Sequence, residues 1–197
     1  FAALVYPGSW PDLKVDAVHL ELADPNSVAA CADRALSLSG GRIDALFNNA
    51  AYGQAGAVED LSVDLLRRQF EVNLFAQHEL IRRLLPGMRR QGHGRIVQCS
   101  SVLGLVAAPM RGAYCASKFA MEGLTDSMRI ELAGSGVHIS LIEPGPIRTR
   151  FVENALSNFL KTIDIDGSVH RAAYEARVER MKLGRNEVFK LEPEAVA

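Results

Sequence analysis

The 197-residue sequence predicts an α/β fold, a three-layer arrangement in which a doubly wound parallel sheet lies between helices. Short apolar runs alternate with longer amphipathic stretches, which is the order that parallel strands and crossover helices require. Three of the apolar runs end in polar or Gly/Pro turns, at Asn48-Asn49, at Ser100-Ser101 and at Pro144-Gly145. Parallel strands end at one edge of a sheet, so these turns should meet where such folds bind ligands.

The first half of the chain contains a regular alternation of predicted strands and helices. A strand is expected over residues 15–22, and residues 1–6 could form another. Asp24 is a helix N-cap followed by Pro25, and the helix should run to about residue 38, where Gly40-Gly41 ends it. The next strand is expected over residues 43–47. After a glycine-containing loop, Ser62 can cap a long helix that reaches residue 90.

The second half continues the same alternation. Residues 95–99 form a continuous apolar run, so this strand is expected to be covered on both faces. A helix over residues 111–133 should end at Gly134 and Gly136, and a strand over 137–142 leads into Pro144-Gly145-Pro146. Residues 151–190 are more charged and amphipathic, with no clear strand. We expect one domain over residues 1–197.

Composition excludes several classes of protein. A net charge of −1 leaves no electrostatic footprint for nucleic acid and no polybasic patch for a membrane surface. The apolar runs are too short to cross a bilayer. Cys31, Cys99 and Cys115 are an odd number of cysteines without metal-ligand spacing, which predicts reduced thiols in a cytoplasmic protein and no metal site.

The main candidate for chemistry is the pair Tyr114 and Lys118, four residues apart on one face of a predicted helix. A free tyrosine titrates near pH 10 and is a poor base at neutral pH. A nearby ammonium favours the phenolate, so Lys118 should lower the pKa of Tyr114. The alternative is a surface pair with no chemical role.

Other polar residues lie at fixed positions around this pair. Ser101 ends a strand and precedes Tyr114 by thirteen residues, a spacing that favours it over its neighbour Ser100. Asn73 stands between Val72 and Leu74 within the predicted long helix, where it could also serve only to satisfy backbone groups.

Together these motifs resemble the short-chain dehydrogenase/reductase family over about residues 15–149, and most closely its branch of 17β-hydroxysteroid and retinol dehydrogenases. The resemblance implies a Rossmann-type sheet. It also implies that Tyr114 is the general acid/base, that Lys118 lowers its pKa and holds the nicotinamide ribose, and that Ser101 binds the substrate oxygen. Asn73 would support a proton relay.

The resemblance also implies a cofactor, NAD or NADP. Asn49 and Ala50 are expected near its adenosine ribose, and Glu21 and Leu22 near its adenine. The residues expected near the nicotinamide are Pro144, Gly145, Ile147 and Thr149. Asn48 would brace neighbouring strands, and Tyr114 and Lys118 would contact the cofactor as well.

The function implied is hydride transfer between the nicotinamide and a secondary alcohol or carbonyl of a small, apolar substrate, in a homodimer or homotetramer. Residues 150–190 fall where the family has a variable substrate-binding segment, and its apolar residues are Phe151, Leu156, Phe159, Leu160 and Ile163. The alternative function is a non-catalytic nucleotide-binding or scaffold protein. It does not account for an intact Asn-Ser-Tyr-Lys set.

Three positions depart from the family pattern. No glycine-rich loop follows a first strand, so no residue is assigned to the pyrophosphate, and the residue that selects NAD or NADP is not recognised. We therefore expect the N-terminal βα unit to lie outside this sequence, within a longer polypeptide. Ala51 replaces a glycine and Glu21 replaces an aspartate.

Overall fold

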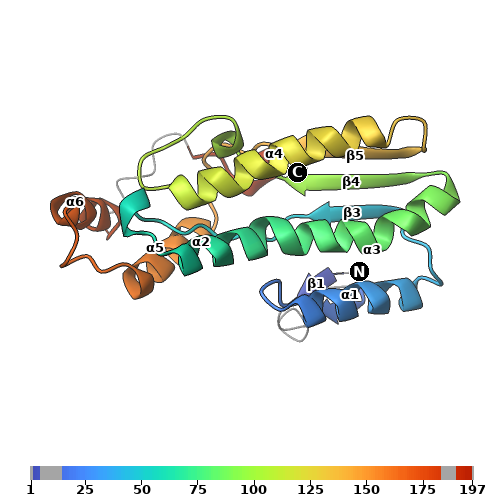
Figure 1. Cartoon of the computed structure of the whole chain (residues 1–197), viewed down its shortest axis with the longest axis horizontal. Coiled ribbons are helices and arrows are strands. Elements are labelled where there is room, and N and C mark those ends of the chain that lie inside the picture. The colour runs from blue at the N-terminus through green and yellow to red at the C-terminus, as the bar shows by residue number, and fades with distance from the viewer. Residues whose placement is uncertain (1, 5–14, 183–189, 197) are drawn as a thin grey trace.

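A computed structural model describes residues 2–4, 15–182 and 190–196. Its strands pair only in parallel and form two sheets (Figure 1). One sheet contains β1 (Ala2–Leu4) and β2 (Ala17–His19), and the other contains β3 (Ala45–Asn48), β4 (Gly94–Cys99) and β5 (Val137–Ile142) in the order β3-β4-β5. In the described part of the chain, no strand joins the two sheets. The predicted parallel α/β class is confirmed.

The three-stranded sheet brings the predicted polar turns together. Asn48 pairs in register with Gln98, and Gln98 with Leu141. The segments that follow these residues therefore leave the sheet at one edge, which is the edge that we expected to hold the ligand site.

The two N-terminal strands differ in length from the prediction. Residues 2–4 of the 1–6 candidate form a strand, and residues 1, 5 and 6 lie outside the described residues. The strand expected over 15–22 is only Ala17–His19. It pairs with β1, which spans three residues. The chain then turns, and the Glu21 N–H donates to Ser27 Oγ at 2.8 Å.

The first two helices begin at the N-cap residues that the sequence predicted. Asp24 accepts from the Asn26 N–H at the start of α1 (Pro25–Leu38), and Ser62 accepts from the Leu65 N–H at the start of α2 (Val63–Phe70). The long helix expected from Ser62 to residue 90 is helical without a break over residues 63–91, but a π-helical turn, Glu71–Phe75, lies within it between α2 and α3 (Ala76–Gln91). The next helix, α4 (Gly112–Glu131), ends two residues before the predicted end.

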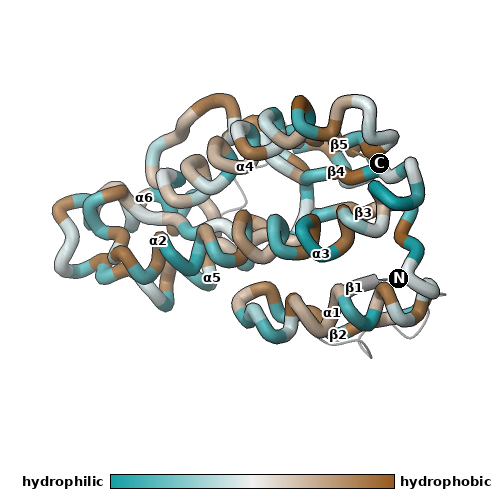
Figure 2. The backbone as a smooth tube through the Cα atoms, turned by 45° about the vertical axis from the view of Figure 1, so that its right-hand side comes forward, coloured by the Kyte–Doolittle hydropathy of each residue, from teal (hydrophilic) through white to brown (hydrophobic). Residues whose placement is uncertain are grey.

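Helices α1, α3 and α4 lie along the same side of the strands (Figure 1). Ile96, Val137 and Ile139 are buried against them, whereas Arg95, His138 and Ser140, on the other face, are exposed. The continuous burial expected for residues 95–99 is therefore not observed, since no helix within the described ranges packs on that second face. Figure 2 shows the matching mixture of hydrophobic and hydrophilic residues along these three helices.

Two further helices, α5 (Phe151–Thr162) and α6 (Arg171–Lys182), lie beyond the carboxyl edge of the sheet (Figure 1). They have a core of their own, in which Phe159 and Ile163 pack with Tyr174. Leu160, expected to belong to the apolar cover, is instead 50% exposed, because it is turned about 100° around α5 from the buried Phe159. Short 3₁₀ turns cover Val58–Asp60, Val102–Gly104 and Pro193–Ala195.

A small polar latch fixes the start of α6. The Tyr174 hydroxyl donates to Asp60 Oδ2 at 2.5 Å and accepts from the Ala57 N–H at 2.7 Å. Ser168 Oγ donates to the same carboxylate oxygen at 2.6 Å. Through these hydrogen bonds Asp60 joins α6 to the loop that leads into α2.

Among the described helices, none combines the length and apolarity needed to cross a bilayer.

Candidate active site

Tyr114 and Ser101 come together at the carboxyl end of β4. Ser101 caps the 3₁₀ turn after this strand: its Oγ accepts from the Leu103 N–H at 3.1 Å and donates to the Pro144 carbonyl at 3.5 Å. Tyr114 is buried in the first turns of α4. Burial has the largest effect on the pKa of Tyr114 and raises it, while the nearby Ser101 hydroxyl acts in the opposite direction and favours the phenolate. The thirteen-residue spacing thus joins two hydroxyls at one place.

The pKa of Tyr114 nevertheless lies above its ordinary value. Burial disfavours the phenolate and is the largest cause; the Ser101 hydroxyl and the nearby Arg111 guanidinium act in the opposite direction and are weaker. The expected lowering by Lys118 is not observed in this structure. Tyr114 is therefore a protonated phenol at neutral pH, which is the form that donates a proton.

Lys118 binds the backbone at the end of β4. Its Nζ donates to the Cys99 carbonyl at 2.6 Å and lies 5.8 Å from the centroid of the Tyr114 ring. The side chain is only 1% exposed, and burial lowers the pKa of its ammonium to about 8. An ammonium has three donor hydrogens, and Cys99 is its only hydrogen-bond acceptor among the described residues. The remaining donors fit the hydroxyls of a ribose.

Three buried amides form a row that the sequence analysis missed apart from its middle member. We name Gln69, Asn73 and Gln77 the amide stripe; they recur every four residues along α2, the π-turn and α3, and none is more than 2% exposed. Gln69 Nε2 donates to the Tyr52 carbonyl at 2.9 Å, and Gln77 Nε2 donates to the Ala50 carbonyl at 2.7 Å. The four-residue repeat of polar side chains was the signal that could have identified it.

Asn73 binds both backbone groups of Tyr52, in the loop after β3. Its Oδ1 accepts from the Tyr52 N–H at 3.1 Å, and its Nδ2 donates to the Tyr52 carbonyl at 2.9 Å and to Ser117 Oγ at 3.3 Å. The side chain thus satisfies backbone groups, as the structural alternative expected, and also links this loop to α4. Its part in a proton relay stays a prediction.

The expected cofactor residues lie at the ends of several strands. Asn48 braces the sheet as expected, donating to Gln98 Oε1 at 2.8 Å, and Asn49 and Ala50 follow it with exposed side chains. The segment after β5 carries the half-buried Pro144 and Ile147 and the exposed Gly145 and Thr149. These residues share the edge with Tyr114.

Glu21 and Leu22 belong to the other sheet, after β2. Both are half-buried, and the Glu21 carboxylate accepts from the Ala23 N–H at 3.2 Å. The carboxylate thus closes a local turn.

In the described ranges no cluster of His, Cys, Asp or Glu could hold a metal ion, and Cys31, Cys99 and Cys115 are free.

Known proteins with similar sequences belong to one family. The family model for short chain dehydrogenases matches residues 10–158. The uncharacterized oxidoreductase YbbO of Escherichia coli K12 is 47% identical over 137 residues, which are 70% of this chain and 51% of that protein. Human 17-beta-hydroxysteroid dehydrogenase type 1 is 38% identical over 154 residues, 78% of this chain and 46% of the relative.

A solved structure agrees with these matches. A protein described as an NAD(P)-dependent gluconate 5-dehydrogenase from Beutenbergia cavernae, with NADP bound at low occupancy, superimposes with a TM-score of 0.65 at 33% identity. The match covers 73% of this chain and 57% of that one. The chain belongs to the short-chain dehydrogenase family, as its motifs taken together predicted. It spans about half the length of the curated relatives it matches.

Proposed function

We propose that this chain carries the catalytic residues of an NAD(P)-dependent oxidoreductase that interconverts a secondary alcohol and a carbonyl compound. The observation that carries the proposal is the buried Tyr114 phenol beside the Ser101 hydroxyl, with Lys118 one helical turn further along α4. Membership of the short-chain dehydrogenase family and the names of the relatives support it.

The nicotinamide cofactor, when bound, supplies or accepts the hydride. In the reducing direction Tyr114 donates its proton to the oxygen of the substrate carbonyl, and its raised pKa keeps that proton available at neutral pH. Ser101 hydrogen-bonds the same oxygen, where negative charge develops. Lys118 binds the ribose hydroxyls with the donors that Cys99 leaves free.

The remaining cofactor contacts are part of the same proposal. Asn49 and Ala50 would lie along the adenosine ribose, and Glu21 and Leu22 near the adenine. Pro144, Gly145, Ile147 and Thr149 would line the nicotinamide. The NADP in the B. cavernae structure supports a nicotinamide cofactor here. We assign no residue of this chain to the pyrophosphate and make no choice between NAD and NADP.

Residues 1–197 would form a single domain whose segment 150–190 contacts an apolar part of the substrate. An exposed apolar surface around α4 supports a homodimer or homotetramer: Phe75, Phe119 and Leu124 are 50%, 46% and 37% exposed beside a shallow hollow. The three free thiols support a cytoplasmic location.

Tyr114→Phe tests the proposed reaction in the full-length protein. Oxidation of NADH and NADPH is followed with a panel of ketones and aldehydes. The variant should lose at least a hundredfold in kcat, because general acid catalysis contributes on the order of 10²–10⁴. Cofactor affinity, measured by fluorescence titration, should stay within about twofold, since the phenyl ring and Lys118 remain. Turnover that survives this change would exclude Tyr114 as the proton donor.

The two serines after β4 provide a matched control for that experiment. Ser101→Ala should lose turnover, whereas Ser100→Ala should retain it, because the Ser100 hydroxyl has no hydrogen-bond partner among the described residues. Equal losses in both variants would remove the specific role of Ser101.

A further inference from the structure

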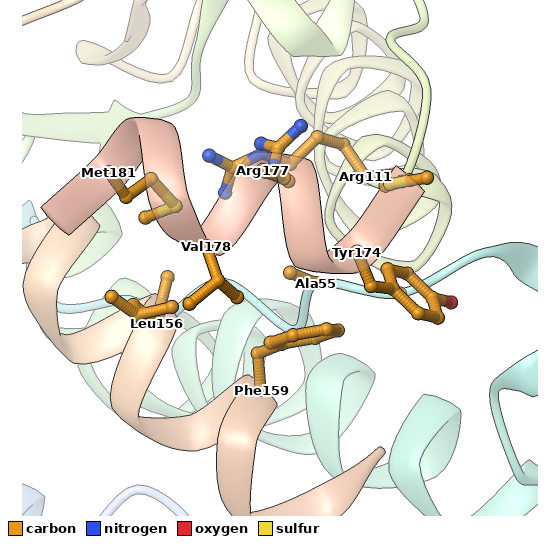
Figure 3. A pocket seen from close by; sticks show the side chains of 11 residues that line it. Ala55, Arg111, Leu156, Phe159, Tyr174, Arg177, Val178 and Met181 are labelled. Atoms are coloured by element: carbon orange, nitrogen blue, oxygen red, sulfur yellow. The ribbon is translucent and has the colours of Figure 1, made fainter. Parts of the chain in front are cut away.

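A narrow pocket lies next to the candidate active site, between α5, α6 and the start of α4 (Figure 3). One part of it is apolar and the other part is cationic. The side chains that matter are Leu156, Phe159, Val178, Met181, Arg111 and Arg177. In Figure 3 Arg111 and Arg177 lie together on one side of the pocket, and Leu156 and Phe159 lie on the opposite side.

Neither arginine of this pocket has an anionic partner in the described part of the chain. Both side chains are half-buried, and no ion pair or hydrogen bond joins either one to a described residue. The pKa of Arg177 is lowered by burial, as the largest cause, and then by the positive charges of Arg111 and Arg180. Two like charges removed from water without a counter-charge cost free energy. The arrangement is therefore built for an anion.

The position of Arg111 is fixed by its backbone. Arg111 forms an isolated parallel bridge with Gly56, whose N–H donates to the Met110 carbonyl at 3.1 Å. Met110 has a φ of 59°, in the left-handed region that is uncommon outside glycine. Strained backbone of this kind persists where the surrounding structure enforces it, often beside functional sites.

The Phe151 ring lies between the cationic side of the pocket and the catalytic tyrosine. A Cβ on Gly53 would lie 3.0 Å from the Phe151 ring and 3.7 Å from Arg111 Nη1. The Phe151 ring in turn packs edge-on against Tyr114, with 5.4 Å between the ring centroids. A substrate that reaches both the arginines and Tyr114 therefore has to displace the Phe151 ring from this space.

We propose that the substrate of this enzyme carries an oxyanion, most simply a carboxylate, which Arg111 and Arg177 bind while its carbonyl group lies at Tyr114 and Ser101. This inference rests on the proposed oxidoreductase function. The planar guanidinium groups match a carboxylate or a phosphate by paired hydrogen bonds. The apolar side chains of α5 and α6 contact the carbon chain between the two polar ends. The substrate is then a keto acid or hydroxy acid, or the corresponding phosphate ester.

The pocket has to open for such a substrate. Its cavity volume is about 10 Å³, the space of about one water molecule. Arg177 and Met181 lie on α6, so an outward movement of this helix would widen the pocket from the side that carries one of the two cations.

Paired substrates test the charge requirement in the full-length protein. We would compare levulinate with its methyl ester, and dihydroxyacetone phosphate with dihydroxyacetone, each with wild type, Arg177→Met and Arg180→Met. Arg180 is the matched control, because it is an exposed arginine on the same helix and does not line the pocket. Wild type should prefer at least one anionic compound by about tenfold or more in kcat/KM, the effect of one charge-assisted hydrogen bond. Arg177→Met should remove that preference through KM, and Arg180→Met should keep it.

The outcomes separate this inference from the proposed function. Turnover of the neutral compounds without any preference for the anions would overturn the inference and leave the function intact. A preference confined to the phosphate pair would support the oxyanion and assign it to phosphate. If no compound is turned over, the function fails for this panel, and protection against thermal unfolding decides the inference. Levulinate should then raise the Tm of wild type and of Arg180→Met but not of Arg177→Met, and equal protection of all three would overturn it.

Discussion

The two sides of the candidate cleft are held in different ways. One side, which we name the wall, consists of β4, α4 and the amide stripe, and its buried polar groups bind main-chain atoms. Asn73 holds both the N–H and the carbonyl of Tyr52, and Lys118 holds the carbonyl of Cys99. The other side, the lid, consists of α5 and α6. It is attached by a small apolar core, by the latch at Asp60, and by side-chain contacts that join α5 to Gln54 and His170 to Glu59.

This difference separates the geometry of catalysis from the binding of substrate. Main-chain partners hold the backbone of the wall, and the contact between Tyr114 and the Phe151 ring of α5 is where the lid touches the catalytic residue. The lid has few attachments and can move as a local unit, because local opening follows from a low density of buried contacts. The wall should therefore respond to mutation with global changes in stability, and the lid with local ones.

The largest change in stability should come from Asn73→Ala, which tests whether the wall depends on the amide stripe. It removes three hydrogen bonds and leaves the N–H and carbonyl of Tyr52 without this partner. We expect a loss of about 3 kcal/mol in the free energy of unfolding, measured by urea denaturation. Asn154→Ala, at an exposed position on α5, should cost less than about 0.5 kcal/mol. Similar losses in both variants would show that the stripe does not hold the wall.

Lys118→Met should have the next largest effect, and with the opposite sign. Burial lowers the folded-state pKa of Lys118 from 10.5 to about 8, so the folded chain carries the cost of a buried charge at every pH below about 8. That cost falls as pH rises from 8 towards 10.5, where the folded lysine is neutral and the unfolded lysine is still protonated.

After subtraction of the lost hydrogen bond to Cys99, the Lys118→Met variant should be more stable than wild type by about 2 kcal/mol at pH 7. The gain should shrink above pH 8, and turnover should be lost. Denaturation at several pH values measures this, with the exposed Lys161→Met as control. A variant less stable than wild type at pH 7 would mean that the buried Lys118 ammonium does not cost the wall stability.

Tyr174→Phe should have the smallest effect and tests the lid. The change removes the hydroxyl that accepts from the Ala57 N–H and donates to Asp60. We expect a loss of about 1 kcal/mol, with faster hydrogen exchange confined to α6 and the loop around Ala57. Ser168→Ala removes a hydrogen bond to the same carboxylate and leaves Ala57 paired, so exchange at Ala57 should stay slow. Faster exchange in α4 as well would show that the lid and the wall move together.

Local sequence signals predicted the wall better than the lid. The caps at Asp24 and Ser62, the polar strand ends and the Tyr114 and Lys118 spacing all depend on neighbours in sequence, and the structure contains each of them. The pKa of Tyr114 was predicted in the wrong direction, because burial depends on distant segments that no spacing reveals.

The lid depends on contacts between residues far apart in the chain. The latch joins Tyr174 to Ala57 across 117 positions, and no local pattern in either segment indicates the partner. The short strand β2 has a similar cause, since its length follows from its partner. The two arginines of the pocket were likewise absent from the prediction, because nothing in a sequence shows that two cations share one cavity.

The π-turn at Glu71–Phe75 has a consequence for how the helix can be altered. On a regular α-helix, a four-residue repeat drifts around the axis by about 40° per repeat. A π-turn has more residues per turn, and so it offsets part of this drift between Gln69 and Gln77. Deleting one residue here would rotate everything beyond it by about 100°. Gln77 would then swing away from Ala50, so this helix tolerates substitutions far better than changes of length.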